Sequence, residues 1–306
     1  MKQLFLPLGL ILSVIFSLTL PAGGNLIANN YGTKILVFII FLVSGHQIGS
    51  KGLALGKNFT ATFLAAAIIS LLLGPILGLV TARILDFPFY LATGLIIAST
   101  VPPTLSSGVI ITGVSRGNTS LALFLTITLN LLGIISIPFI LDLILKAAGP
   151  VDIDQFSLLM KMLFFVLFPL VSGKGIARFF KNNNLFSFLP YVNSSCVILI
   201  VYASLATSRD AFATLTALEY VLILSGVASV HFLLLLTSFV TAILLRLNSA
   251  DTKALVFVTS QKTLPIAIAI LANIQIDTGN AIIVILIFHF FQLFTDSLLA
   301  AAVQNR

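Results

Sequence analysis

The chain has 306 residues, of which 59% are hydrophobic and only 8% are charged. Soluble domains carry about 25% charged residues, so this composition excludes an ordinary soluble domain and fits a chain surrounded mostly by lipid. The net charge is +7, but no stretch is basic enough to follow a phosphate backbone, so nucleic-acid binding is set aside. The single cysteine, Cys196, excludes an internal disulfide.

Hydrophobic runs of about 20 residues predict transmembrane helices. Ten such runs follow one another, at residues 4–20, 35–50, 60–85, 89–114, 119–146, 156–178, 189–208, 217–245, 254–274 and 279–303. The first begins MKQLFLPLGLILSVIFSLTL, which has the lysine and apolar core of a signal peptide. The PAGGNLIANN that follows lacks a cleavage pattern, so we expect this run to remain as a helix.

Basic residues are divided unevenly between the two ends of the predicted helices. At the end that holds the N-terminus lie Lys2, Lys51, Lys57, Arg116, Lys174, Arg178, Lys181, Arg246, Lys253 and Arg306. At the opposite end lie Lys34, Arg83, Lys146 and Arg209, with the acidic Asp86, Asp152, Asp154, Asp210, Glu219 and Asp277. Because cytoplasmic loops of membrane proteins are rich in lysine and arginine, both termini are predicted to be cytoplasmic, in a plasma or inner membrane.

The segment AAGPVDIDQ, residues 147–155, is the most obvious interruption between the long apolar blocks. It divides the chain into five predicted helices in residues 1–150 and five in residues 151–306. Because five is odd, the second half enters the membrane from the opposite side, which is the topology of an inverted repeat. The predicted fold class is an all-α polytopic membrane protein with ten transmembrane helices in a 5+5 inverted repeat.

Helix breakers fall in the fourth and the ninth predicted helices. STVPPTLSSGV contains Pro102 and Pro103, and TSQKTLPIA contains Pro265. A proline removes a backbone donor, so we expect both helices to be interrupted. Two interrupted helices in corresponding positions indicate a transport site. The alternative is that these prolines only kink ordinary membrane helices. The polar side chains that we assign to the site at the breaks are Thr104, Ser106, Ser107, Thr259, Ser260, Gln261, Lys262 and Thr263.

Three segments resemble the bile acid:sodium symporter family. PPTLSSGVIITGVSRGNTSLALFLTITLN resembles the region that joins the family's fourth and fifth helices. MKMLFFVLFPLVSG resembles its sixth helix, and DTKALVFVTSQKTLPIA resembles the segment that leads into its ninth. The resemblance covers the whole chain in the number and order of helices. The motif SQKTLP indicates the less characterised branch, whose members are labelled sodium-dependent transporters.

The resemblance implies a panel domain and a core domain, with helices four and nine broken and crossing beside two sodium ions. It also shows departures. Phe257 stands where the family has a glutamate that touches both ions, and Lys262 stands where it has an asparagine. Ser107 replaces another asparagine, and Ser70 replaces a glutamine of the third helix, while Thr126 is retained. Sodium prefers oxygen ligands, especially charged ones, so we expect an altered metal site that has lost its carboxylate and gained a positive charge.

The lysine at the ninth break allows three interpretations, since a charge at a bilayer centre costs about 3 kcal/mol. In the first, its ammonium replaces a sodium ion, and transport is sodium-independent, or coupled to protons if burial makes the lysine release its proton. In the second, it is static and offsets the negative ends of half-helices. In the third, it faces water and sodium is held elsewhere. The contacts expected in the first interpretation are with Gln261, Ser106, Ser107, Thr126 or Asn130.

Three further polar residues lie inside predicted helices. His231 and His289 are expected to make hydrogen bonds in helix packing rather than to relay protons. Asp296, in the last turns of the tenth helix, is expected to reach the cytoplasmic interface; the alternative is that it faces the bundle and pairs with a base.

The function expected from these features is secondary active transport of small organic anions by alternating access. Half-helix N-termini and Lys262 favour an anionic substrate. The alternatives are a sodium-coupled anion symporter with a modified ion site and a non-transporting membrane regulator.

An enzyme is not expected, because the chain has no HExxH or GxSxG motif and no paired intramembrane aspartates. No cofactor is expected beyond sodium or a proton as coupling ion. The expected partners are the anion and the lipid bilayer, and the oligomeric state stays open.

Overall fold

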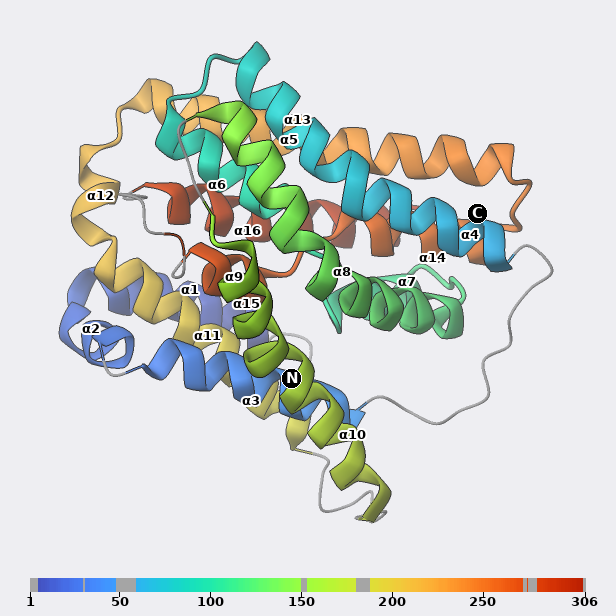
Figure 1. Cartoon of the computed structure of the whole chain (residues 1–306), viewed down its shortest axis with the longest axis horizontal. Helices are drawn as coiled ribbons and strands as arrows, with labels where there is room; N and C mark the ends of the chain where they lie inside the picture. Colours follow the sequence, from blue (N-terminus) through green and yellow to red (C-terminus); the bar gives the residue numbers. More distant parts are fainter. Residues whose placement is uncertain are drawn as a thin grey trace.

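The computed structural model describes residues 5–29, 31–47, 59–149, 153–179, 188–271, 274 and 280–304, and within them every regular element is a helix (Figure 1). The first half contains α1 (Phe5–Thr19), α2 (Pro21–Asn29), α3 (Gly32–Gln47), α4 (Phe59–Ala67), η1 (Ile68–Leu73), α5 (Gly74–Ile84), α6 (Phe89–Thr100), α7 (Ser107–Val114) and α8 (Thr119–Ala148). The second half contains α9 (Gln155–Met162), η2 (Leu163–Leu167), α10 (Phe168–Phe179), α11 (Leu189–Thr207), α12 (Arg209–Thr214), α13 (Ala217–Leu244), α14 (Ser249–Ser260), α15 (Leu264–Leu271) and α16 (Ala281–Ala302).

Several helices are long and apolar enough to cross a membrane. Among the described residues there are seven: Phe59–Ile84, Thr119–Ala148, Gln155–Phe179, Leu189–Thr207, Ala217–Leu244, Ser249–Leu271 and Ala281–Ala302. The pair Leu8–Thr19 and Pro21–Asn29, bent by 99°, would make an eighth. Each of the ten predicted runs contains helix, although Gly32–His46 and Phe89–Thr100 are shorter than the long spans. The chain is therefore an all-helical, polytopic, integral membrane protein.

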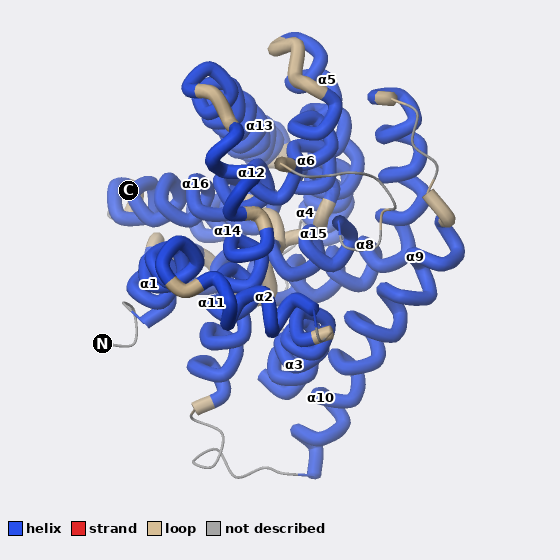
Figure 2. Tube along the Cα trace, turned by 90° about the vertical axis from the view of Figure 1, so that its left-hand side faces the viewer, coloured by secondary structure: helices blue, strands red, loops and turns tan. Residues whose placement is uncertain are grey.

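The helices pack in two groups. In one, α11 packs against α1, α2 and α3, and α10 packs against α3, in the lower part of both general views (Figures 1 and 2). In the other, α6 packs against α5, α8 and α16, while α14 packs against α7, α8 and α13. The interrupted helices α6–α7 and α14–α15 thus lie in and around the second group.

Both predicted interruptions are present. In the first, α6 ends at Thr100 and α7 begins only at Ser107, with Val101 extended at φ −64° and ψ 152°. In the second, α14 ends at Ser260, and Gln261 is extended at φ −81° and ψ 147° before α15 begins. The residue before a proline is disfavoured in the helical region, which explains the extended Val101. Pro265 of the second break lies in the first turn of α15, where a residue without an N–H loses no helical hydrogen bond.

The span Phe59–Ile84 contains a π-helical segment, η1, that leaves one carbonyl without a partner in the helix. The backbone N–H of Gly74 donates to the carbonyl of Ile69, five residues back. The next donor in this register would be residue 75 to the carbonyl of Ser70, but Pro75 has no N–H. A second proline has the same position, because Pro169 follows η2 as Pro75 follows η1. Single π turns often mark functional sites.

Two hydrogen bonds join helix ends that are far apart in the sequence. Asn118 at the start of α8 donates from Nδ2 to Asp251 Oδ1 of α14 at 2.8 Å. Arg83 at the end of α5 donates to the carbonyl of Ala147. The charged positions Lys2, Lys51, Lys57, Asp152, Lys181, Asp277 and Arg306 lie outside the described residues.

Two glycines allow α3 and α10 to touch backbone to backbone. A Cβ atom on Gly173 would lie 1.9 Å from the carbonyl oxygen of Leu42, and one on Gly45 would lie 2.0 Å from that of Leu170. Both distances are far inside van der Waals contact. Small residues at helix contacts let membrane helices approach closely, and α3 and α10 use them in this way.

The substitution Gly173→Ala is expected to destabilise the protein by about 1–3 kcal/mol, because the new methyl group must push α10 away from α3. The matched control is Gly175→Ala on the same helix, where a Cβ would meet nothing within 4 Å. Thermal unfolding of the purified protein in detergent measures both. Equal midpoints for the two variants would show that the close approach is not needed.

Candidate functional site

The two helix breaks touch each other. The backbone N–H of Thr263 in the second break donates to the carbonyl of Pro102 in the first, at 3.0 Å. The side chain of Gln261 crosses between them, and its Oε1 accepts from Ser107 Oγ at 2.6 Å and from Thr104 Oγ1 at 3.1 Å. The structure therefore brings three of the assigned side chains and the backbone of a fourth residue, Thr263, together at the meeting point of α6–α7 and α14–α15.

The backbone at the second break is satisfied by one side chain of α16. Gln292 accepts from the N–H of Lys262 at 2.8 Å through Oε1 and donates from Nε2 to its carbonyl at 2.7 Å. Buried backbone groups need partners, and lipid offers none. The primary amide of Gln292 pairs with both groups as a neighbouring strand would.

The ammonium of Lys262 is buried, with 2% of the residue exposed. Its Nζ donates to the carbonyl oxygen of Ser70 at 2.6 Å and lies 3.4 Å from the Ser70 Oγ. This is the carbonyl that η1 and Pro75 leave without a helical donor. Gly74 provides the space, since a Cβ there would lie 2.9 Å from Nζ.

The contacts expected for this ammonium are wrong. The described residues show no hydrogen bond from its Nζ to Gln261, Ser106, Ser107, Thr126 or Asn130. Nor does the ammonium face water, because it is enclosed between η1 and the second break. The reason lies in the third span, where a π turn followed by proline offers a free carbonyl that a lone serine in the sequence does not reveal.

Asp296 belongs to the site: the expectation that it reaches the cytoplasmic interface is wrong, and the alternative, that it faces the bundle and pairs with a base, is confirmed. It is fully buried, and its Oδ2 accepts from Gln261 Nε2 at 2.9 Å. Its Oδ1 lies 3.0 Å from His231 Nε2. The site therefore has a carboxylate after all, supplied by α16 rather than by position 257. Phe257 is instead buried in an apolar cluster with Ile111.

A sequence signal for this carboxylate exists in HFFQLFTD. His289, Gln292 and Asp296 are spaced i, i+3 and i+7, which places them on one face of α16. His289 Nδ1 lies 3.2 Å from Gln292 Nε2. His231 therefore makes the expected helix-packing hydrogen bond, from α13 to Asp296 of α16, whereas the contact of His289 is with Gln292 on its own helix. Considered one by one, these residues gave no indication of the polar face that they form together on α16.

The remaining assigned residues, all of them in the described part of the chain, make no hydrogen bond with Lys262 Nζ. Thr259 turns away from the lysine and pairs with Ser238 Oγ at 2.6 Å. Ser106 is exposed at the N-cap of α7 and makes no side-chain cap bond. Three of the assigned residues each have a buried side-chain oxygen without a hydrogen-bond partner: Thr126 Oγ1, Asn130 Oδ1 and Ser260 Oγ.

The three unpartnered oxygens have neighbours at the breaks. Asn130 Nδ2 donates to the carbonyl of Pro103 at 2.8 Å, so this side chain lies beside the first break. Thr126 is one turn away on α8, and Ser260 ends α14, which packs on α8. Buried oxygens of this kind can accept from a donor or coordinate a cation.

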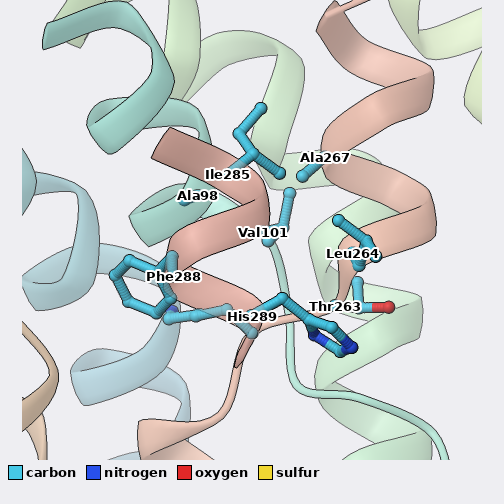
Figure 3. A pocket seen from close by; sticks show the side chains of 9 residues that line it. Ala98, Val101, Thr263, Leu264, Ala267, Ile285, Phe288 and His289 are labelled. Carbon is cyan, nitrogen blue, oxygen red and sulfur yellow. The ribbon is translucent and has the colours of Figure 1, made fainter. Parts of the chain in front are cut away.

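A small hollow adjoins the lysine between α6, α15 and α16. Figure 3 shows Val101, Thr263 and His289 on its wall, with mainly apolar side chains around them. Lys262 and Thr263 of the second break thus border a small apolar hollow, which has room for about one water molecule.

The substitution Gln292→Leu is expected to lower stability by about 2–5 kcal/mol, because it leaves the N–H and the carbonyl of Lys262 buried without partners. The matched control is Gln304→Leu, just past the end of α16. Thermal unfolding in detergent compares them. A midpoint for Gln292→Leu as high as that of the control would contradict the role of Gln292 in holding the break.

Known proteins resemble the chain over nearly its whole length. The model of the SBF-like CPA transporter family matches residues 4–305. The chain is 29% identical over 313 residues to the "Probable sodium/metabolite cotransporter BASS4, chloroplastic" of Arabidopsis thaliana, which covers 96% of the chain and 71% of that relative. The protein of the same name in Oryza sativa subsp. indica is 30% identical over 319 residues, with 96% and 74% covered.

An animal relative is similar over a shorter region. The "Sodium/bile acid cotransporter 7" of Rattus norvegicus is 28% identical over 226 residues, which covers 71% of the chain and 65% of that relative. The expected resemblance to the bile acid:sodium symporters is thereby confirmed. With its apolar helices and its two helix breaks in contact, the chain belongs to the SBF-like CPA transporter family, within the bile acid:sodium symporter superfamily.

Proposed function

We propose that this protein transports small organic anions by alternating access and that the Lys262 ammonium takes the place of a sodium ion. The observation that carries the proposal is the 2.6 Å contact between Lys262 Nζ and the Ser70 carbonyl, buried beside the meeting point of two broken helices. The relatives are named sodium/metabolite and sodium/bile acid cotransporters, which supports transport as the activity.

The ammonium suits the place of a bound cation. It carries the same charge as sodium and is held by a carbonyl oxygen, the type of ligand that hard cations prefer. Unlike sodium it is tethered, so it stays when the protein changes state. Transport with a tethered cation in this position is sodium-independent. Coupling to protons would follow if the lysine released its proton during the cycle.

An anionic substrate fits the electrostatics of the breaks. The N-terminus of a helix carries a partial positive charge and free N–H groups. α7 begins inside the membrane-embedded part of the chain with the exposed Ser106 at its N-cap. Lys262 adds a full positive charge nearby, whereas the surrounding hollow is mainly apolar. A small organic anion with an apolar body matches this combination.

The proposed architecture is a ten-helix inverted repeat, with residues 1–150 and 151–306 as the two halves and both termini cytoplasmic. The group α1–α3 with α9–α11 serves as the panel, and the group around α6, α8, α13, α14 and α16 serves as the core. Motion of one group against the other opens the breaks to each side in turn. The two packing groups and the paired helix ends support this arrangement.

A second candidate is sodium-coupled symport through a modified ion site. The observation that favours it is the set of buried oxygens without partners on Thr126, Asn130 and Ser260. These three oxygens lie on two packed helices and are the type of ligand that sodium prefers. A third candidate, a non-transporting regulator, needs no small anion and would show no thermal stabilisation by one.

The test is uptake of radiolabelled taurocholate, benzoate and succinate into proteoliposomes, with sodium and pH gradients imposed separately. We expect wild-type uptake of at least one anion to persist when choline replaces sodium. Lys262→Gln is expected to reduce uptake by about tenfold or more or to make it sodium-dependent, since a buried group of the site loses its charge. Lys34→Gln, at the surface, is the charge-matched control.

Other outcomes separate the candidates. Wild-type uptake that requires sodium and ignores pH would show that the lysine does not replace the ion, and it would favour the second candidate. pH-dependent uptake retained in Lys262→Gln would exclude this lysine as the proton carrier. Absence of both uptake and anion-induced thermal stabilisation would favour the regulator.

A further inference from the structure

A chain of hydrogen bonds connects α7 to α16 through the second helix break. It runs from the backbone N–H of Gly108 to Thr104 Oγ1 at 3.2 Å, and from the paired hydroxyls of Thr104 and Ser107 to Gln261 Oε1. It continues from Gln261 Nε2 to Asp296 Oδ2 at 2.9 Å. The chain joins both breaks and ends on a fully buried carboxylate.

The carboxylate determines the direction of every bond in this chain. An ionised carboxylate only accepts hydrogen bonds, so Gln261 must turn its NH₂ group toward Asp296. Its Oε1 then faces α7 and accepts from Ser107, while Thr104 donates its single hydrogen to Oε1 or to the Ser107 hydroxyl. The backbone N–H of Gly108 already donates to Thr104, so each hydrogen points toward Asp296. The bond to His231 completes the pattern, because Nε2 of His231 must also donate.

We propose that Asp296 is a positioning residue of the transport site, whose negative charge orients Gln261 and thereby the hydroxyl groups of Thr104 and Ser107 at the first break. This inference rests on the proposed function, because the orientation affects activity only if the breaks bind the transported anion. Lys262, next to Gln261 in sequence, carries the opposite charge, so the pair of charges leaves the buried centre close to neutral. The other ionisable groups near Asp296 are His231 on α13 and His289 on α16.

Neutralising the carboxylate is expected to reverse the chain. In Asp296→Asn, an NH₂ group placed toward Gln261 meets another NH₂ group, and two donors cannot bond. Gln261 must turn over, and its NH₂ then faces Thr104 and Ser107, which have to accept. Gln261→Glu fails for a different reason, because it places two carboxylates side by side.

Exchanging the two groups is expected to restore the pattern. In Gln261→Glu/Asp296→Asn, the new Asn NH₂ donates to the new carboxylate, which still accepts from Thr104 and Ser107. His231 still donates, now to the Asn carbonyl. Every bond of the original chain is remade with the same direction at the first break, although the charge has moved to the neighbouring residue.

A second pair of the same chemistry provides the control. Gln155 Nε2 donates to Asp142 Oδ2 at 2.6 Å, where α8 and α9 meet, away from the breaks. The variants Asp142→Asn, Gln155→Glu and their combination change the same groups in the same way. They report the effect of breaking and exchanging a carboxamide–carboxylate pair that does not orient the site.

The experiment measures taurocholate, benzoate and succinate uptake and thermal unfolding for both sets of variants. We expect each single change at Gln261 or Asp296 to lower uptake per folded protein by about tenfold or more and the exchange to return it to within about threefold of wild type, since residues in one network do not act additively. The control set should change uptake by less than about twofold. Full uptake by Asp296→Asn would overturn the proposal, and so would no recovery in the exchange.

The two measurements separate this inference from the proposed function. If the wild type carries none of the three anions, the proposed function fails, but thermal unfolding still tests the direction of the chain. Recovery of stability in the exchange would support that direction, and equal loss in single and double variants would overturn it. If the variants at Gln261 and Asp296 lose stability but keep uptake, Asp296 is only structural and the positioning role is wrong.

Discussion

A polypeptide that leaves helical geometry inside a lipid bilayer must find protein partners for its backbone, and the centre of this protein is arranged around that constraint. Gln292 pairs with both backbone groups of Lys262, and the Thr263 N–H reaches the Pro102 carbonyl. These backbone groups of the breaks are thus hydrogen-bonded either to the other break or to the side-chain amide of Gln292 on α16. A polar, extended stretch can persist at this depth only because these bonds replace the missing water.

The same constraint explains where the charges lie. The π turn before Pro75 frees the Ser70 carbonyl, and the Lys262 ammonium fills that vacancy in the hydrogen bonding of the third span. Asp296 supplies the opposite charge from α16 through Gln261. The resemblance to sodium symporters suggested a site with a carboxylate lost at Phe257. The carboxylate of the site comes instead from Asp296 on α16, and the Lys262 ammonium lies on the residue next to its partner Gln261.

These features relate the proposed activity to the fold. The breaks bring a helix N-terminus and two hydroxyl groups to the same crossing as a buried positive charge, and the residue that carries this charge also borders a small apolar hollow. A directed chain of hydrogen bonds connects them to α16. Gln261 touches both breaks and the carboxylate, so in the proposed transport cycle it is the residue that would link substrate recognition to the charge of Asp296.

The sequence by itself determined the helical spans and both interruptions, because hydrophobic length and proline act locally. It also identified Gln261, Lys262, Thr104 and Ser107 as members of one site. Only the tertiary structure decided what the lysine binds and where the carboxylate comes from. The partner of Lys262 is a backbone carbonyl, which every residue has, and Asp296 lies 35 positions from Gln261. Such contacts depend on how α16 and the third span pack against the breaks; the spacing in HFFQLFTD marks a polar face on α16 but does not say what that face contacts.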